Sequence, residues 1–316
     1  MLVLDPASGD VTHTIIRELP RHLGPGDLLV LNDSRVIPAR LIGKRRDGGE
    51  AEVLLLRPLD NERHRWEALI RPARRLDIGS QVRFDGSALL VSIDERHDEM
   101  SIVRLNGVTD PLAEVHRIGV MPTPPYIKER LRDPERYQTV FAQEEGSAAA
   151  PTAGLHFTPA LLSAIGERGV RIAFITLHVG VDTFRPVRVD DPTKHAIHRE
   201  WFRIDDATAR AVNDTRQKGR RVVAVGTTVV RVLETAGTGD QVEPGDGWTG
   251  LLILPGHEFR IVDALLTNFH LPRSSLLMLV SAFAGRERVL AAYSEAISER
   301  YRFYSFGDCM FVTKHV

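Results

Sequence analysis

The chain has 316 residues, and 43% of them are hydrophobic, so it is long enough to bury the core of one large domain or of two ordinary ones. The 41 Lys and Arg residues nearly cancel the 42 Asp and Glu residues, and the net charge of −1 excludes a globally basic nucleic-acid-binding protein. The single cysteine, Cys309, excludes an internal disulfide framework and any site built from several cysteines of this chain.

The N-terminus, "MLVLDPASGD", lacks the basic start and apolar core of a signal peptide. The longest apolar run, "LLMLVSAFA" at 276–284, is too short to cross a bilayer. We therefore expect a cytoplasmic protein with no membrane partner, and the lone cysteine agrees with a reducing compartment.

The first part of the chain predicts a buried strand and turn followed by a β unit. "GDLLVLNDSRVIPAR" at 26–40 is typical of the strand and turn, and residues near 40 to 120 form short alternating runs broken by Gly, Asp and Pro. These runs predict antiparallel hairpins in a small β-barrel or meander. We expect this β domain, 39–123, to be inserted into an α/β domain made of 1–38 and 124–316.

Two basic clusters lie in the predicted β domain or just before it. Arginine beside an aromatic residue suits phosphate contacts and base stacking, whereas a solvated charged face would have the same composition. The first cluster, our predicted RNA-binding set, contains Arg35, Arg40, Lys44, Arg45 and Arg46; the second contains Arg65, Arg71, Arg74 and Arg75 beside Trp66.

After residue 150 the pattern alternates between helix and strand, which is typical of a sheet covered by helices. Within "APTAGLHFTP", Thr158 followed by Pro159 predicts the start of a helix. "FITLHVGVDTFRPV" at 174–187 predicts a strand that ends at His178, with Asp182, Thr183 and Arg185 following it. A plain connection with a solvated arginine is the alternative for this stretch.

"VVAVGTTVVRVLE" at 222–234 predicts a strand, a turn at Gly226 and a helix carrying Arg231 and Glu234. Free N–H groups and the hydroxyls of Thr227 and Thr228 could hold a carboxylate or a ribose at such a helix start. An ordinary role for threonine as a helix N-cap explains the same residues equally well.

"LLTNFHLPRSS" at 265–275 places Asn268 and His270 after a predicted strand, although a lone histidine is more often structural than catalytic. "KHAIHREW" at 194–201 offers His195, His198 and Glu200 to a metal, but the spacing is not that of HExxH and no fourth ligand is evident, so we expect no metal. The sequence contains no Gly-x-Ser-x-Gly elbow, Walker loop or complete dinucleotide fingerprint.

Long stretches resemble the S-adenosylmethionine:tRNA ribosyltransferase-isomerase family of queuosine biosynthesis. They run nearly end to end and include "PGDLLVLNDSRVIPARL", "AAPTAGLHFT", "TLHVGVDTFRPV", "AVGTTVVRVLE", "VDALLTNFHLPRSSLLMLVSAFAG" and "YRFYSFGDCMF". The resemblance implies an α/β main domain with an inserted β-barrel, and an enzyme that consumes S-adenosylmethionine as a cosubstrate without another cofactor.

The implied reaction transfers the ribosyl portion of S-adenosylmethionine to 7-aminomethyl-7-deazaguanine at the wobble position of tRNAs with GUN anticodons. It yields epoxyqueuosine-tRNA and releases adenine and methionine. One cysteine cannot supply the three thiolates of a radical S-adenosylmethionine enzyme, so the chemistry should be polar.

The resemblance also suggests site residues. His156, His178 and His270 are the candidates for proton transfer, with the order of their roles left open. The candidates for holding the cosubstrate or the modified base are Thr152, Gly154, Asp182, Thr183, Arg185, Thr227, Thr228, Arg231, Glu234 and Asn268.

Two alternatives stay open: a non-catalytic tRNA-binding relative, and an enzyme that acts on a small nucleotide without RNA. We expect a monomer. Members of the family generally carry further residues, including a polar arginine-containing segment, before the strand that begins here at Met1. We therefore expect either that translation begins upstream or that this chain lacks an edge element.

Overall fold

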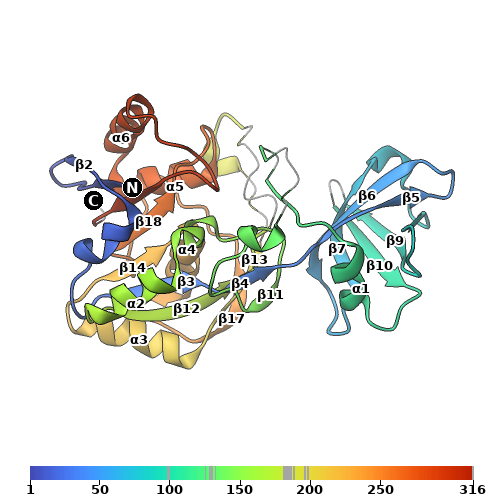
Figure 1. The fold of residues 1–316 in the computed structure, drawn as a ribbon, viewed down its shortest axis with the longest axis horizontal. Coiled ribbons are helices and arrows are strands. Elements are labelled where there is room, and N and C mark those ends of the chain that lie inside the picture. The colour runs from blue at the N-terminus through green and yellow to red at the C-terminus, as the bar shows by residue number, and fades with distance from the viewer. Residues whose placement is uncertain are drawn as a thin grey trace. The chain divides into compact units, whose positions relative to one another are not determined.

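The computed structural model describes residues 1–97, 100–124, 126–127, 131, 133–180, 187, 189–195, 197 and 199–314. The chain divides into two compact units, which we call the main unit and the barrel unit (Figure 1). The main unit consists of Met1–Ser34, Tyr137–Glu144 and Pro151–Val316, and the barrel unit of Arg35–Arg136 and Glu145–Ala150.

The main unit is built on a mixed sheet of nine strands within the described residues. In spatial order they are β17 (Gly245–Thr249), β13 (Glu200–Ile204), β12 (Arg171–Leu177), β3 (Leu28–Asn32), β14 (Val222–Val225), β18 (Ala264–Asn268), β19 (Cys309–Val312), β1 (Leu2–Leu4) and β2 (Val11–His13). The central four, β12, β3, β14 and β18, are parallel to one another. Their carboxyl ends therefore meet at one edge of the sheet, which we call the carboxyl edge.

Helices cover this sheet (Figure 1). They are α2 (Pro159–Glu167), α3 (Asp206–Gln217), α4 (Thr227–Ala236), α5 (Ser275–Ala284) and α6 (Arg286–Ser298), with the short 3-10 helices η1 (Ile16–His22), η4 (Thr152–His156) and η6 (Pro192–Lys194). A small hairpin of β15 (Gly237–Thr238) and β16 (Gln241–Val242) follows α4. Leu161 and Ile165, one turn apart on α2, pack with Leu31 and Val225 of the sheet in one apolar cluster.

The barrel unit contains a closed antiparallel barrel of six strands. Around the barrel they are β10 (Met100–Asn106), β7 (Arg65–Arg71), β6 (Glu50–Pro58), β5 (Arg40–Arg45), β8 (Gln81–Arg83) and β9 (Leu90–His97). Ala51, Val53 and Leu55 alternate into its core with Trp66, as expected for strands with one buried face. The helix α1 (Pro111–Ile118) and the turn η2 (Ala73–Arg75) belong to this unit, and β4 (Ser34–Val36), β11 (Glu144–Ser147) and η3 (Pro134–Tyr137) lie where the chain passes between the units.

The predicted fold class, an α/β sheet with an antiparallel β-barrel from the middle of the chain, is confirmed. Local signals place the helix starts: the Thr158 hydroxyl accepts the Leu161 N–H (3.2 Å), and the Asp205 carboxylate accepts the Thr208 N–H (2.7 Å). Among the described residues, no helix is long and apolar enough to span a membrane.

Candidate active site

Asn268, the last residue of β18, connects the carboxyl edge to the η4 turn. Its Oδ1 accepts a hydrogen bond from the Thr152 hydroxyl (3.0 Å), and its Nδ2 donates to the backbone carbonyl of Tyr304 (3.2 Å). The same Nδ2 lies 3.1 Å from His156 Nε2. One amide thus holds three segments that are far apart in the sequence, and three sequence-predicted residues come together.

The partners of Asn268 also determine where His156 carries its proton. Because the Tyr304 carbonyl can only accept, the nitrogen facing it must be the NH₂ group, and that group donates its other hydrogen to His156 Nε2. Neutral His156 therefore carries its proton on Nδ1. Burial lowers the pKa of His156 to about 4, so the ring is neutral at physiological pH.

His270 follows the same strand and is also neutral. Its Nε2 lies 2.8 Å from the Thr267 hydroxyl, and its backbone N–H donates to Tyr293 Oη in α6 (2.9 Å). Burial lowers the pKa of His270 to about 4. A hydroxyl can donate or accept, so this contact allows either ring nitrogen of His270 to carry the proton.

His178 lies directly after β12 at the same edge. Its ring stacks on Trp201 with centroids 5.1 Å apart, and its backbone N–H donates to the Trp201 carbonyl (3.0 Å). The three candidate histidines therefore follow β12 (His178), follow β18 (His270) or contact the end of β18 (His156). Asp182, Thr183 and Arg185 of the candidate binding set lie outside the described residues.

A buried ion pair joins α4 to the start of β13. Arg231 Nη1 donates to Glu200 Oε2, and both side chains are nearly inaccessible to solvent. Glu200 Oε1 accepts the Gly180 N–H (2.8 Å), and Arg231 Nε donates to the Leu251 carbonyl (3.0 Å). Glu200 belongs to the stretch in which the sequence predicted no metal, and in the structure it pairs with Arg231, a predicted binding residue.

The start of α4 differs from the ordinary threonine N-cap considered from the sequence. The N-cap is Gly226, with φ +90°, a conformation that favours glycine, and no side chain caps the helix. Thr227 and Thr228 are the first two helical residues and are buried. Their hydroxyls are therefore not used as the N-cap.

The carboxylate of Glu234 is held by backbone N–H groups. It accepts the N–H groups of Arg260 (3.0 Å), Ile261 (3.1 Å) and Val262 (3.0 Å), which lead into β18. This arrangement gives Glu234 a structural role in anchoring the segment before β18, and its role as a ligand residue stays a prediction.

Gly154 owes its presence to packing. A Cβ at this position would lie 2.8 Å from Thr139 Cγ2 and 2.9 Å from Phe141 Cζ, both too close for any side chain. The glycine thus allows η4 to pack tightly against these two side chains. That it also contacts a ligand stays a prediction.

Asp33 is a carboxylate at the carboxyl edge that the sequence-based set missed. It follows β3 and accepts a hydrogen bond from the Thr176 hydroxyl (2.7 Å). Burial raises the pKa of its carboxyl group, and the Thr176 bond opposes that shift. The available signal was its position directly after the apolar run of β3, "LLVLN".

No group of three or more His, Cys, Asp or Glu side chains in the described part of the chain could hold a metal ion. His198, one of the residues weighed for a metal, lies outside that part.

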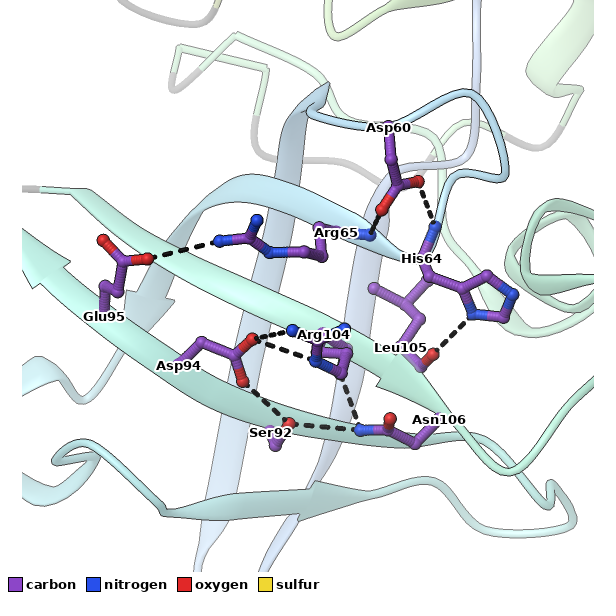
Figure 2. A network of polar contacts seen from close by, with 9 residues as sticks. All are labelled: Asp60, His64, Arg65, Ser92, Asp94, Glu95, Arg104, Leu105 and Asn106. Carbon is purple, nitrogen blue, oxygen red and sulfur yellow. Dashed lines mark hydrogen bonds and ion pairs between the residues drawn. The ribbon is translucent and has the colours of Figure 1, made fainter.

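Figure 2 shows two arginines of the barrel, Arg65 and Arg104, paired with acids. Arg65 contacts Glu95 (3.2 Å), Arg104 contacts Asp94 (3.0 Å), and Asp60 accepts the backbone N–H of Arg65 (2.9 Å). Both arginine charges are therefore locally neutralised.

The predicted RNA-binding cluster is also largely paired. Four of its five members have an acidic partner: Arg35–Glu135 (2.7 Å), Arg40–Glu52 (2.6 Å), Lys44–Asp85 (2.7 Å) and Arg45–Asp47 (3.3 Å). Arg46 is exposed and has no acidic partner within the residues that the structure describes, and the same is true of Arg71, Arg74 and Arg75.

The suggestion that Trp66 stacks on a base is wrong. The side chain is 1% exposed in the barrel core, and its Nε1 donates to the Arg63 carbonyl (2.7 Å). Side chains alternate between the two faces along β7, and Trp66 faces the barrel core. The arginine beside it in the strand, Arg65, therefore lies on the opposite face.

Comparison with known proteins gives matches over nearly the whole chain. The family model described as "Queuosine biosynthesis protein" matches residues 1–312. The S-adenosylmethionine:tRNA ribosyltransferase-isomerases of Heliobacterium modesticaldum and Natranaerobius thermophilus are 52% and 50% identical, over 99% of this chain and 92% of each relative.

A solved structure is similar as well. The crystal structure of S-adenosylmethionine tRNA ribosyltransferase from Thermotoga maritima matches with a TM-score of 0.54 and 37% sequence identity, covering 98% of this chain and 91% of that one. The chain belongs to the S-adenosylmethionine:tRNA ribosyltransferase-isomerase family of queuosine biosynthesis.

Proposed function

We propose that this chain transfers and isomerises the ribosyl portion of S-adenosylmethionine onto 7-aminomethyl-7-deazaguanine at the tRNA wobble position. The products are epoxyqueuosine-tRNA, adenine and methionine. The observation that carries this proposal is the Asn268 centre, which joins Thr152 and His156 at the carboxyl edge of a chain that matches the family along its length. Ligands of open α/β sheets bind at this edge.

The proposed enzyme consumes S-adenosylmethionine as a cosubstrate and uses no further cofactor. It acts as a monomer in the cytoplasm on tRNAs with GUN anticodons. Its only thiol, Cys309, is buried, and burial raises the pKa of that thiol to about 12, so it is kept from thiolate chemistry. The main unit carries the chemistry, and the inserted barrel domain supplies RNA contacts.

The reaction needs a base for the acidic proton beside the sulfonium, an unprotonated amine, and a donor for departing adenine. We assign the donor to His156. Its Nε2 accepts from Asn268, so the neutral ring acts as a hydrogen-bond donor to the departing adenine through Nδ1–H and keeps that proton. Accepting a proton at Nε2 would require breaking the Asn268 bond.

We assign the base to His270. With the Thr267 hydroxyl as its partner, the ring can carry its proton on Nε2 and keep Nδ1 free to accept another. Its lowered pKa keeps it unprotonated at neutral pH. His178, stacked on Trp201, remains a third candidate for proton transfer.

Single-turnover assays on His156→Ala, His178→Ala and His270→Ala test these roles. We expect each folded variant to bind both substrates and to turn over at least about 100-fold more slowly. Variants that bind normally and turn over at the parental rate would remove the corresponding histidine from the chemistry.

The function is tested by incubating the protein with S-adenosylmethionine and tRNA carrying the precursor base. We expect adenine and a heavier nucleoside in equal amounts. Binding of tRNA without adenine release would indicate a non-catalytic relative, and turnover with the free base regardless of tRNA would indicate a small-nucleotide enzyme.

For the RNA contacts we propose the basic residues Arg35, Arg40, Lys44, Arg45 and Arg46. Arg46 is the strongest member, because it is exposed and has no acidic partner within the described residues, whereas the others must exchange a carboxylate for a phosphate. Arg71, Arg74 and Arg75 share the features of Arg46 and extend the proposed set.

A further inference from the structure

Two buried polar groups on α4 have no hydrogen-bond partner among the described residues. They are Thr228 Oγ1 and Arg231 Nη2, on residues that are 7% and 5% exposed. Leaving a polar group buried and unpaired costs free energy, so such groups call for an explanation.

Thr228 lies in the first turn of α4, and Arg231 follows it by three residues. Residues three apart lie on one face of a helix, and side chains tilt toward its N-terminus. Thr228 Oγ1 lies 3.6 Å from the position that a Cβ would take on Gly226, the N-cap residue. No described side chain caps this helix, so the N–H groups of its first turn lack a side-chain cap.

The guanidinium of Arg231 is held in position while Nη2 stays available. Nη1 is paired with Glu200, and Nε donates to the Leu251 carbonyl (3.0 Å). Glu200 is in turn fixed by the Gly180 N–H (2.8 Å). The positive charge is therefore already compensated in the free protein, and neither N–H bond of Nη2 has a partner among the described residues.

A hydroxyl, a guanidinium NH₂ and a helix N-terminus together form a donor set for a carboxylate or another oxyanion. The only anionic group of S-adenosylmethionine at neutral pH is the carboxylate of its methionine portion. η4 borders the same place, because the position of a Cβ on Gly226 lies 3.4 Å from Ala153 Cβ. η4 also carries Thr152 and His156, which contact Asn268.

We propose that the N-terminus of α4, with Thr228 Oγ1 and Arg231 Nη2, binds the methionine carboxylate of S-adenosylmethionine, and that Glu200 is a positioning residue for Arg231. The inference rests on the proposed function for the identity of the cosubstrate. It assigns the methionine end to α4, and it leaves the rest of the molecule to extend toward Asn268 and His156.

Thr228→Val tests this inference, because valine has the shape of threonine and removes only the hydroxyl. Since that hydroxyl has no partner in the described protein, we expect an unchanged or higher melting temperature. Titration calorimetry should show that the parent protein binds S-adenosylmethionine at least about tenfold more tightly than decarboxylated S-adenosylmethionine. Thr228→Val and Arg231→Lys should each lose most of this preference.

Thr235→Val is the matched control on the same helix. Its hydroxyl contacts Thr249 Oγ1 (2.7 Å), away from the N-terminus, so the preference for the carboxylate should be unchanged. Equal affinity of the parent for the two compounds, or a preference that Thr228→Val retains, would overturn the inference. Weaker tRNA binding by Thr228→Val with unchanged S-adenosylmethionine binding would also overturn it, in favour of an RNA phosphate.

The binding measurement needs no turnover. It can therefore contradict the carboxylate site without contradicting the proposed function, and the reverse also holds. If the preference is present and lost as expected but no adenine is released with precursor tRNA, the carboxylate site stands and the proposed function fails. If adenine is released and the preference is absent, the function stands and the carboxylate site fails.

Discussion

Asn268 is the residue on which the proposed chemistry depends most. Its amide is the only side chain type that can accept from the Thr152 hydroxyl while donating to both the Tyr304 carbonyl and His156 Nε2. The position of the proton on His156 therefore follows from a residue that contains no titratable group.

Asn268→Asp should reverse the hydrogen bond between residue 268 and His156 Nε2, so that the histidine becomes the donor. A carboxylate oxygen in place of Nδ2 would repel the Tyr304 carbonyl and accept a hydrogen bond from a protonated His156 Nε2, and its negative charge would raise the pKa of His156 from about 4. The histidine signals in NMR titrations of the parent and the variant should show this rise together with a loss of turnover. An unchanged pKa of His156 would show that the Asn268 contact does not control the ring.

The two partly buried histidines, His156 and His270, should also make stability depend on pH. Their pKa values are about 4 in the folded protein and ordinarily 6.5. Between these values the unfolded chain binds more protons than the folded one, so the free energy of unfolding falls as pH falls from 6.5 to 4. At about 1.4 kcal/mol per pH unit, each histidine accounts for at most about 3 kcal/mol of that loss.

Denaturant unfolding between pH 7 and pH 4 measures this effect. A folded His156→Gln/His270→Gln variant should lose less stability than the parent over the same interval. The parent and the variant should show the same dependence above pH 6.5, where neither state protonates these rings. Identical losses below pH 6.5 would contradict the lowered pKa values.

Among the elements, η4 is held by close packing. Gly154→Ala would place its Cβ 2.8 Å from Thr139 Cγ2 and 2.9 Å from Phe141 Cζ, and relieving such overpacking costs about 1–3 kcal/mol. Because η4 carries Thr152 and His156, the shift should also slow turnover. Thermal unfolding and single-turnover rates measure the two effects.

Gly166→Ala in α2 is the matched control. Nothing lies within 4 Å of its added Cβ, and alanine favours a helix over glycine by about 1 kcal/mol. This variant should be slightly more stable, with parental turnover. A Gly154→Ala protein as stable and as active as the parent would show that η4 tolerates displacement.

The elements that could be predicted from the sequence are those specified by neighbouring residues. Thr158–Pro159 starts α2 and the acidic Asp205 starts α3, because capping depends on residues a few positions away. The Glu200–Arg231 pair joins residues 31 positions apart, and no local signal indicates such a contact. The packing reason for Gly154 was hidden in the same way, because its neighbours Thr139 and Phe141 belong to a separate segment.

For the whole molecule, the net charge of −1 means that RNA binding must come from local charge. The alternating pattern predicted the barrel correctly, but it did not show which arginines are paired with acids or that Trp66 is buried. Such pairing depends on neighbours across strands rather than along one strand.

Charge reversal at Arg46, Arg74 and Arg75 should therefore weaken tRNA binding. Each lost phosphate contact should reduce the slope of log affinity against log salt by about 1. Arg210→Glu, an exposed reversal on α3 of the main unit, is the control for net charge and should leave the slope unchanged. Equal slopes for all variants would place the RNA contacts elsewhere.

The most direct test of the proposed reaction follows the ribosyl group itself. S-adenosylmethionine labelled in its ribose is mixed in a single turnover with precursor tRNA and either the parent protein or Asn268→Ala. We predict one labelled ribosyl group in tRNA per adenine released by the parent, and a rate at least about 100-fold lower for a folded Asn268→Ala that still binds both substrates. Adenine release without label in tRNA, or an Asn268→Ala rate equal to that of the parent, would contradict this proposal.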